Sequence, residues 1–254
     1  MIKNTFFSAC LLGLLLSMNL GCGKKEKKTV ELEAEADSHV RADLSDREND
    51  NYGCHEFMTV GTNRVGTPDA MRALIRFDLQ AIPPKSSIKT ARLTLTVHSF
   101  DNGTPSSTYT VNIHRIVDSG PRTPWQEGNG AERTPQPSGC VWVDEASGVA
   151  WVGAGDGGDA NNQTQPDFDP AVVASATVNQ GATSPGDTLG WDITALVQEW
   201  IDKTSPNHGI LLRDTTTAGL FLFRGVRFGD REGKIHNIPG SVDGPRLTAT
   251  FVRK

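Results

Sequence analysis

The chain has 254 residues, of which 37% are hydrophobic and only 7% aromatic, with 26 glycines and 14 prolines. Its formal net charge is -5 and its pI is about 5.7. This composition suits one large domain and excludes a protein with several membrane spans. A sequence-independent nucleic-acid binder is usually basic, so the acidic balance argues against nucleic acid as a partner.

Residues 1–21 have the features of a bacterial export signal. Lys3 supplies a positive charge, Phe6 to Met18 form a hydrophobic run, and Leu20-Gly21-Cys22 follows it. The run is too short to span a bilayer as a helix. Its ending is similar to a lipobox, in which Cys22 receives a diacylglyceryl group, although Asn19 stands where leucine is usual. We therefore expect an exported, lipid-anchored protein of the cell envelope, with plain secretion as the alternative.

The exported part consists of a tether and one domain. Residues 22–29 are dominated by lysine and predict a solvated tether, and residues 30–254 show no repeat or internal boundary. Cys54 and Cys140 are the only cysteines of this domain. In an exported protein such a pair can form a disulfide. Two free thiols are the alternative, because cysteines far apart in sequence carry no evidence of contact.

Most of the domain is predicted to be β-structure, because apolar and polar residues alternate with a period of two. In chain order, strands are expected at Val30 to Val40, Phe57 to Gly61, Arg72 to Gln80, Ala91 to His98, Thr108 to Val117, Val172 to Val178, Ile210 to Arg213, Leu220 to Phe228 and Arg246 to Val252. A long segment of low periodicity, residues 118–169, interrupts this series. It is rich in glycine, proline and aspartate and holds three of the five tryptophans.

One helix is predicted, from Trp191 to Ile201. Its apolar residues recur at helical spacing and form one stripe: Ile193, Leu196, Val197, Trp200 and Ile201. Asp192 is the expected N-cap, and Ser205-Pro206 ends the element. Many strands and one short amphipathic helix predict an all-β protein, an antiparallel β-sandwich of the jelly-roll type.

The strongest alternation lies in residues 72–98, on both sides of a proline turn. One face of these two strands is apolar and predicts core. The other face is polar and carries three arginines: Arg72, Arg76 and Arg92. Because guanidinium groups bind carboxylate or sulfate in a bidentate manner, this face is a candidate ligand-binding patch. The alternative is that the arginines form structural ion pairs with Asp78 or Glu232.

The tryptophans offer a second kind of ligand contact. Trp125 and Trp142, with Trp151, are candidate stacking platforms for sugar rings. The alternative is that they pin the long segment to the sandwich. Trp191 and Trp200 lie next to or on the predicted helix and are expected in the core.

One segment is a candidate calcium site, because it concentrates oxygen ligands. Asp156, Asp159 and Asn161 stand among glycines, with Asp167 and Asp169 beyond them. Calcium takes roughly six to eight oxygen ligands. The alternative is a solvated loop without an ion.

An ordered series of short motifs resembles the DNRLRE domain, also classed as carbohydrate-binding module family 96, of bacterial and archaeal surface proteins. The motifs are Ala36-Asp37, Asn51-Tyr52-Gly53, residues 72–79 and 91–95, Trp125-Gln126-Glu127-Gly128, Trp142, residues 151–159, Trp191-Asp192-Ile193-Thr194, Trp200, Asn207-His208-Gly209, Arg231-Glu232 and Pro245-Arg246-Leu247. The resemblance covers nearly all of residues 32–252. It implies a β-sandwich that binds polysaccharides, including acidic ones such as alginate. The segment Val143 to Gly153 departs from the pattern.

No catalytic motif accompanies this resemblance. The six histidines are scattered, and neither a zinc-protease HExxH motif nor a GxSxG nucleophile elbow occurs. A lyase would need a base such as Tyr52 or Tyr109, but the first lies in a turn motif and the second is expected in the core. We therefore expect a non-catalytic surface lipoprotein that binds polysaccharide. The alternative is a structural or adhesive module that binds protein or matrix.

Overall fold

The computed structural model describes residues 26–41, 50–62, 71–101, 107–117, 125–130, 139–140, 144–146, 149–151, 168–215, 224–235 and 242–253. Its strands are β1 (Lys27–Glu33), β2 (Ala36–Arg41), β3 (Phe57–Thr62), β4 (Met71–Arg76), β5 (Ser87–Asp101), β6 (Thr108–Arg115), β7 (Asp144–Ala146), β8 (Val149–Ala150), β9 (Ala174–Asn179), β10 (Thr188–Asp192), β11 (Ile210–Asp214), β12 (Arg224–Gly229) and β13 (Arg246–Val252). The helices are α1 (Thr194–Asp202) and α2 (Arg231–Ile235). Neither of these helices is long and apolar enough to cross a membrane.

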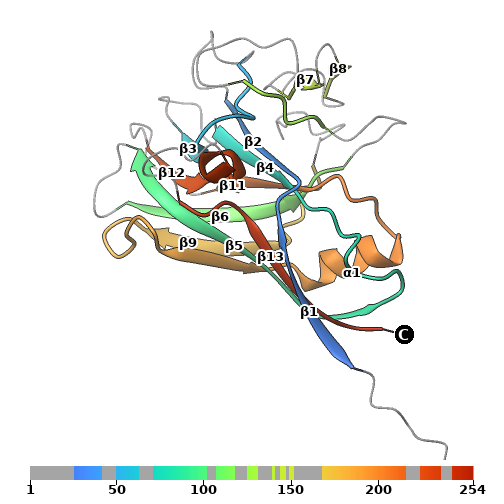
Figure 1. Cartoon of the computed structure of the whole chain (residues 1–254). Coiled ribbons are helices and arrows are strands. Elements are labelled where there is room, and N and C mark those ends of the chain that lie inside the picture. The colour runs from blue at the N-terminus through green and yellow to red at the C-terminus, as the bar shows by residue number, and fades with distance from the viewer. Residues whose placement is uncertain are drawn as a thin grey trace, which may run out of the picture.

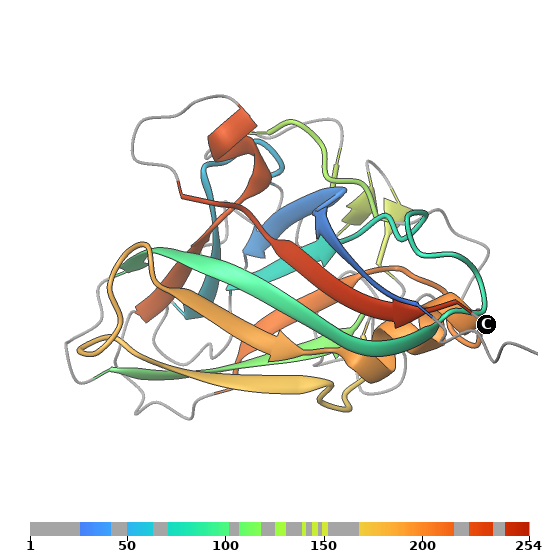
Figure 2. The ribbon, with the colours of Figure 1, turned by 60° about the horizontal axis from the view of Figure 1, so that its bottom comes forward.

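The strands form one curled antiparallel sheet, apart from the small β7–β8 pair (Figures 1 and 2). Its order is β1-β13-β5-β12-β3-β4-β11-β6-β9, with β10 also paired to β5 and β2 also paired to β4. The predicted all-β antiparallel fold is therefore confirmed. The sheet curls around one main core, to which strands of both halves contribute: Leu93 and Leu247 from one half, Val111 and Val178 from the other.

Strand β5 is the longest element and joins the two halves of the sheet. Its first part pairs with β13 on one side and with β10 on the other, and its last part pairs with β12. Helix α1 caps the start of β5, because the Thr194 hydroxyl accepts the Ala91 amide and the Gln198 side chain accepts the Ile88 amide, each at 2.8 Å. Leu196, Val197, Trp200 and Ile201 of the predicted apolar stripe are buried on this side.

A second hydrophobic cluster lies on the opposite face of β2, β4 and β11. Its members come from these strands and from the long irregular segment: Ala36, Val40, Leu74, Ile116, Trp125, Cys140, Trp151, Phe168 and Leu211. This face is therefore covered by chain and is not open to solvent. The prediction that one face of residues 72–80 is polar and exposed is wrong. Leu74 lies on this face between Arg72 and Arg76, and its apolar side chain is buried in the second cluster.

Several predicted boundaries change in the structure. The first predicted strand is two strands, β1 and β2, and β1 begins at Lys27, inside the predicted tether. Trp191 belongs to β10, so the helix begins three residues later than predicted. The predicted N-cap Asp192 is wrong, because the N-cap is Ile193 and no side chain caps the helix. The Asp192 carboxylate still accepts the Thr194 amide at 2.9 Å, just before the helix. The short helix α2 was not predicted, because its five residues carry no apolar stripe.

Candidate functional site

The structure does not bring the three predicted arginines together. Strands β4 and β5 are separated in the sheet by β12 and β3. Arg72 on β4 is only 2% exposed, and its guanidinium carbon lies 5.7 Å from the centre of the Phe168 ring. Arg76 pairs with Glu35 at 3.3 Å and donates to the Trp125 carbonyl at 2.8 Å. For Arg76 the structural alternative is therefore correct, although its acidic partner is neither Asp78 nor Glu232.

The tryptophans that the structure describes are packing residues. Trp125 is 2% exposed, its indole nitrogen donates to the His208 carbonyl at 2.9 Å, and the Arg76 guanidinium lies over its ring. Trp151 is buried in the same second cluster. An exposed stacking role for Trp125 is therefore wrong, and Trp142 lies outside the described residues. Trp191 and Trp200 are core residues, as predicted.

Arg92 is the predicted arginine that reaches solvent. It lies on β5, between β13 and β10, in a polar sheet face that we call the outer face. The outer face consists of every second residue of four adjacent strands: Thr29, Glu31 and Glu33 of β1, Arg246, Thr248 and Thr250 of β13, Thr90, Arg92 and Thr94 of β5, and Thr188, Gly190 and Asp192 of β10. Intervening residues such as Leu93 and Leu247 point into the core. Figure 2 shows β13 and β5 side by side across the front of the molecule.

The absence of a side chain at Gly190 makes room for Arg92. A Cβ atom built on Gly190 would lie 2.2 Å from the Arg92 guanidinium, so this group rests on the neighbouring strand. No hydrogen bond or ion pair joins Arg92 to another residue of the described part of the chain. Arg246, by contrast, pairs with Glu31. Asp192 lies opposite Arg92 on β10, and hydrogen bonds from Thr194, followed by the Arg92 charge, lower the pKa of this carboxylate. Arg92 is therefore exposed beside an acid, without a direct bond to it.

The cysteines and tyrosines have structural positions. Cys54 and Cys140 do not form a disulfide, so the alternative is the one that the structure shows. Burial raises the pKa of the Cys140 thiol to about 12, which keeps it protonated and unreactive. Tyr52 and Tyr109 are both buried, and Tyr109 lies in the core as predicted.

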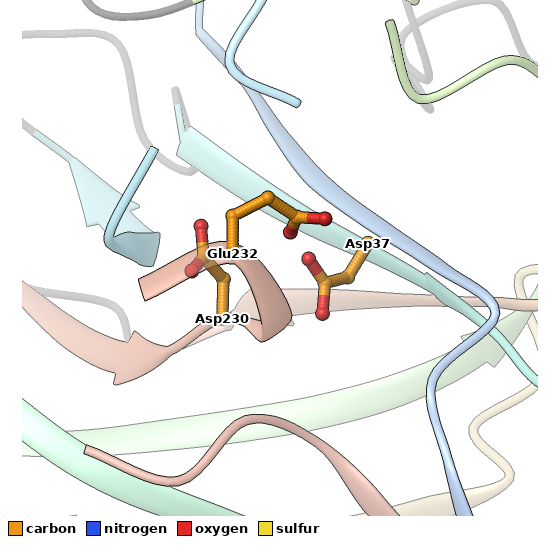
Figure 3. Close-up of side chains that lie close together, drawn as sticks. All are labelled: Asp37, Asp230 and Glu232. Carbon is orange, nitrogen blue, oxygen red and sulfur yellow. The ribbon is translucent and has the colours of Figure 1, made fainter. Parts of the chain in front are cut away.

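The predicted calcium ligands Asp156, Asp159 and Asn161 lie outside the described residues. A different group of acids converges in the described part of the chain. Asp37 on β2, Asp230 after β12 and Glu232 on α2 are all buried, and one carboxylate oxygen from each lies within 4.8 Å of the others (Figure 3). We call these three residues the carboxylate cluster.

Hydrogen bonds from the surrounding backbone fix the carboxylate cluster. The Arg231 amide donates to Asp37 Oδ2 at 3.1 Å, and the Gly233 amide donates to Asp230 Oδ1 at 2.8 Å. The second bond spans three residues and caps the start of α2, which explains why this polar segment is helical. The sequence places Asp230 and Glu232 two residues apart, and the turn of α2 brings both to Asp37.

Glu127 extends the acidic group on the side of the long segment. Its Oε1 accepts the Asp37 amide at 2.7 Å, and its Oε2 accepts Arg231 Nη2 at 2.6 Å. Arg231 Nη2 also lies 2.6 Å from Glu232 Oε1. The group therefore contains four carboxylates and one guanidinium, which contacts Glu127 and Glu232. If all were ionised, the group would hold three negative charges in excess.

Burial and the close approach of these acids raise the pKa values of several of them. Burial, and then the charges of Asp230, Glu232 and Glu127, raise the pKa of Asp37 well above its usual value. Burial is also the main cause that raises the pKa of Asp230 to about 8 and that of Glu127 to about 7. Two buried oxygens, Asp37 Oδ1 and Glu232 Oε2, accept no hydrogen bond from the described residues. The carboxylate cluster could hold a hard cation, since such ions prefer carboxylate oxygens.

Sequence analysis alone did not find this cluster. Asp37, Glu127 and Glu232 each lie in a motif of the DNRLRE resemblance, but they come from distant parts of the chain. The available signal was that three separate motifs each contributed an acid. No protein-family model matches the chain, and a search of curated proteins finds no match. The DNRLRE resemblance therefore stays a prediction from the ordered motifs.

Proposed function

We propose that this protein is a non-catalytic carbohydrate-binding module of the cell envelope, anchored through lipid at Cys22, and that its outer face binds an acidic polysaccharide. The observation that carries the proposal is the outer face itself. It is a four-stranded polar surface whose residues are half threonine, with Arg92 near its middle, opposite Asp192. The ordered motifs of a carbohydrate-binding family support the same function.

The shape of the outer face suits an extended chain. Threonines from all four strands are presented in register, for example Thr29 opposite Thr250 and Thr248 opposite Arg92. Hydroxyl groups can donate to and accept from sugar hydroxyls. A polymer that crosses the strands could therefore make several such bonds in sequence.

Arg92 gives this face its preference for an acidic sugar. Its guanidinium can bind a uronate carboxylate in a bidentate manner. The protein as a whole has a net charge of -5, so its overall field repels an acidic polymer. The outer face also carries Glu31, Glu33 and Asp192, so attraction must come from the Arg92 guanidinium itself. It should weaken as salt is raised because Arg92 is exposed.

The experiment measures affinity for alginate, pectate and a neutral glucan at low and high salt. Arg92→Ala is compared with the wild type, and Arg253→Ala is the matched control, because Arg253 is also exposed and loses the same charge. We expect Arg92→Ala to weaken alginate binding by about tenfold, the loss of one charge-assisted contact. The control should bind like the wild type.

Three outcomes would contradict the proposal. An equal loss of alginate affinity in Arg92→Ala and Arg253→Ala would show that binding depends on net charge and not on the outer face. Binding of protein or matrix components without any glycan binding would favour an adhesive module instead. A neutral glucan that binds best, with no effect of salt, would remove the role of Arg92.

A further inference from the structure

We propose that Asp37, Asp230 and Glu232 bind a calcium ion in the interior of the protein, where β2 meets the segment that joins β12 to α2. This site differs from the acidic loop that the sequence suggested, and it does not depend on carbohydrate binding. It is formed by residues from opposite ends of the chain (Figure 3).

The first argument is that two buried oxygens lack a hydrogen-bond partner. Asp37 is 1% exposed and Glu232 is 6% exposed, yet Asp37 Oδ1 and Glu232 Oε2 accept no hydrogen bond from the described residues. A buried carboxylate oxygen without a partner is costly, and most such oxygens in proteins are satisfied. Figure 3 shows the carboxylates of Asp37 and Glu232 pointing toward one another. A cation between them would satisfy both oxygens.

The second argument is the spacing of the ligands. One oxygen from each of the three carboxylates lies within 4.8 Å of the others. Calcium–oxygen distances are about 2.3–2.6 Å, so ligands on opposite sides of the ion are separated by up to about 5 Å. The three oxygens can therefore contact one ion without a rearrangement of the backbone.

The third argument is charge. The carboxylate cluster and Glu127 carry four acidic groups, and Arg231 is the cation that contacts them in the described residues. Arg231 bonds to Glu232 Oε1 and Glu127 Oε2, and it makes no bond to Asp37 Oδ1 or Glu232 Oε2. A divalent cation would remove most of the excess negative charge.

The ligand set favours calcium over other common ions. All three ligands are carboxylates, whereas zinc sites usually include cysteine or histidine. Magnesium requires a nearly ideal octahedron and keeps several water molecules, which a buried site supplies poorly. Calcium accepts irregular geometry and bidentate carboxylates, as this cluster would provide.

The test is calcium titration of the chelator-stripped protein by calorimetry, together with melting curves in calcium and in chelator. We expect one calcium ion per molecule, weaker binding of magnesium, and a melting temperature several degrees higher at about a hundred times the dissociation constant. Asp37→Asn keeps the side-chain shape but removes the charge, and should reduce calcium affinity at least tenfold. Asp202→Asn is the matched control, because Asp202 is exposed on α1.

Each contrary result identifies a different error. Identical melting curves in calcium and in chelator, with no heat of binding, would show that protons and not a cation neutralise the cluster. Unchanged affinity in Asp37→Asn would place the ion elsewhere, for example at residues 156–161. Equal affinity for magnesium would overturn the choice of calcium. If Asp37→Asn does not fold, Glu232→Gln gives the same test.

Discussion

Asn51 and Gly53 hold the segment that carries Glu127. The Asn51 side-chain amide donates to the carbonyls of Glu127 and Cys140 at 2.6 and 2.8 Å, and its oxygen accepts the Gly130 amide at 2.7 Å. Gly53 allows the backbone to approach, because a Cβ atom there would lie 2.1 Å from the Glu127 carbonyl oxygen. One turn motif therefore sets the position of an acidic group 76 residues away.

Gly53→Ala is predicted to destabilise the protein by about 1–3 kcal/mol or more, since the added methyl group meets rigid backbone. Gly190→Ala is the comparison. Its added methyl group meets only the flexible end of Arg92, so we expect a loss below about 1 kcal/mol. Urea unfolding of both variants measures the difference. Equal stability of the two would show that the contact at Glu127 relaxes without cost.

At the scale of elements, the second hydrophobic cluster attaches the long irregular segment to β2, β4 and β11. Trp125 is one of its two tryptophans, and only one residue lies between Trp125 and Glu127. Two kinds of contact therefore hold the long segment in place, the apolar packing of the Trp125 indole and the hydrogen bonds of Asn51. This attachment links the hydrophobic cluster to the acidic group.

Trp125→Ala is predicted to cost about 3–5 kcal/mol, the usual loss for a buried tryptophan. It should also weaken calcium binding, because Glu127 would no longer be held beside Asp37. Trp200→Ala in α1 is the matched control, since it removes an equally large side chain from the main core and not from the second cluster. Calcium titration of the folded fraction compares the affinities of the two variants. If both variants bind calcium equally, the segment does not organise the site.

At the scale of the whole molecule, the proposed anchor and the described domain are close together in sequence. Strand β1 begins at Lys27, so only residues 23–26 lie between Cys22 and the sheet. β1 is also part of the outer face, through Thr29, Glu31 and Glu33. If Cys22 carries lipid, the outer face would therefore be presented near the membrane surface.

Cys22→Ser is predicted to release the protein from the membrane fraction and to remove the mass of the acyl groups. The domain itself should fold and melt like the wild type, because the change precedes β1. Fractionation and mass spectrometry of the exported protein test this. An unchanged mass and distribution would contradict the lipid anchor and support plain secretion, with Asn19 as the reason.

The local patterns of the sequence determined much of the fold. Period-two alternation correctly located β5, β6 and β13, because one side of each strand is buried in the core and the other is not. Helical spacing likewise identified α1 and its buried Trp200. These features depend on near neighbours in the chain, so the sequence contains all the information that they need.

The tertiary structure alone decided where the functional groups lie. Arg72 and Arg92 looked equivalent in sequence, but β4 is covered by the second cluster and β5 is open, because strand order and coverage depend on distant segments. Asp37, Glu127 and Asp230 meet only because three distant parts of the chain converge. These parts are β2, the segment that Asn51 holds, and the turn between β12 and α2. No local periodicity encodes such contacts, so the buried acids could not be recognised as a group before the chain was folded.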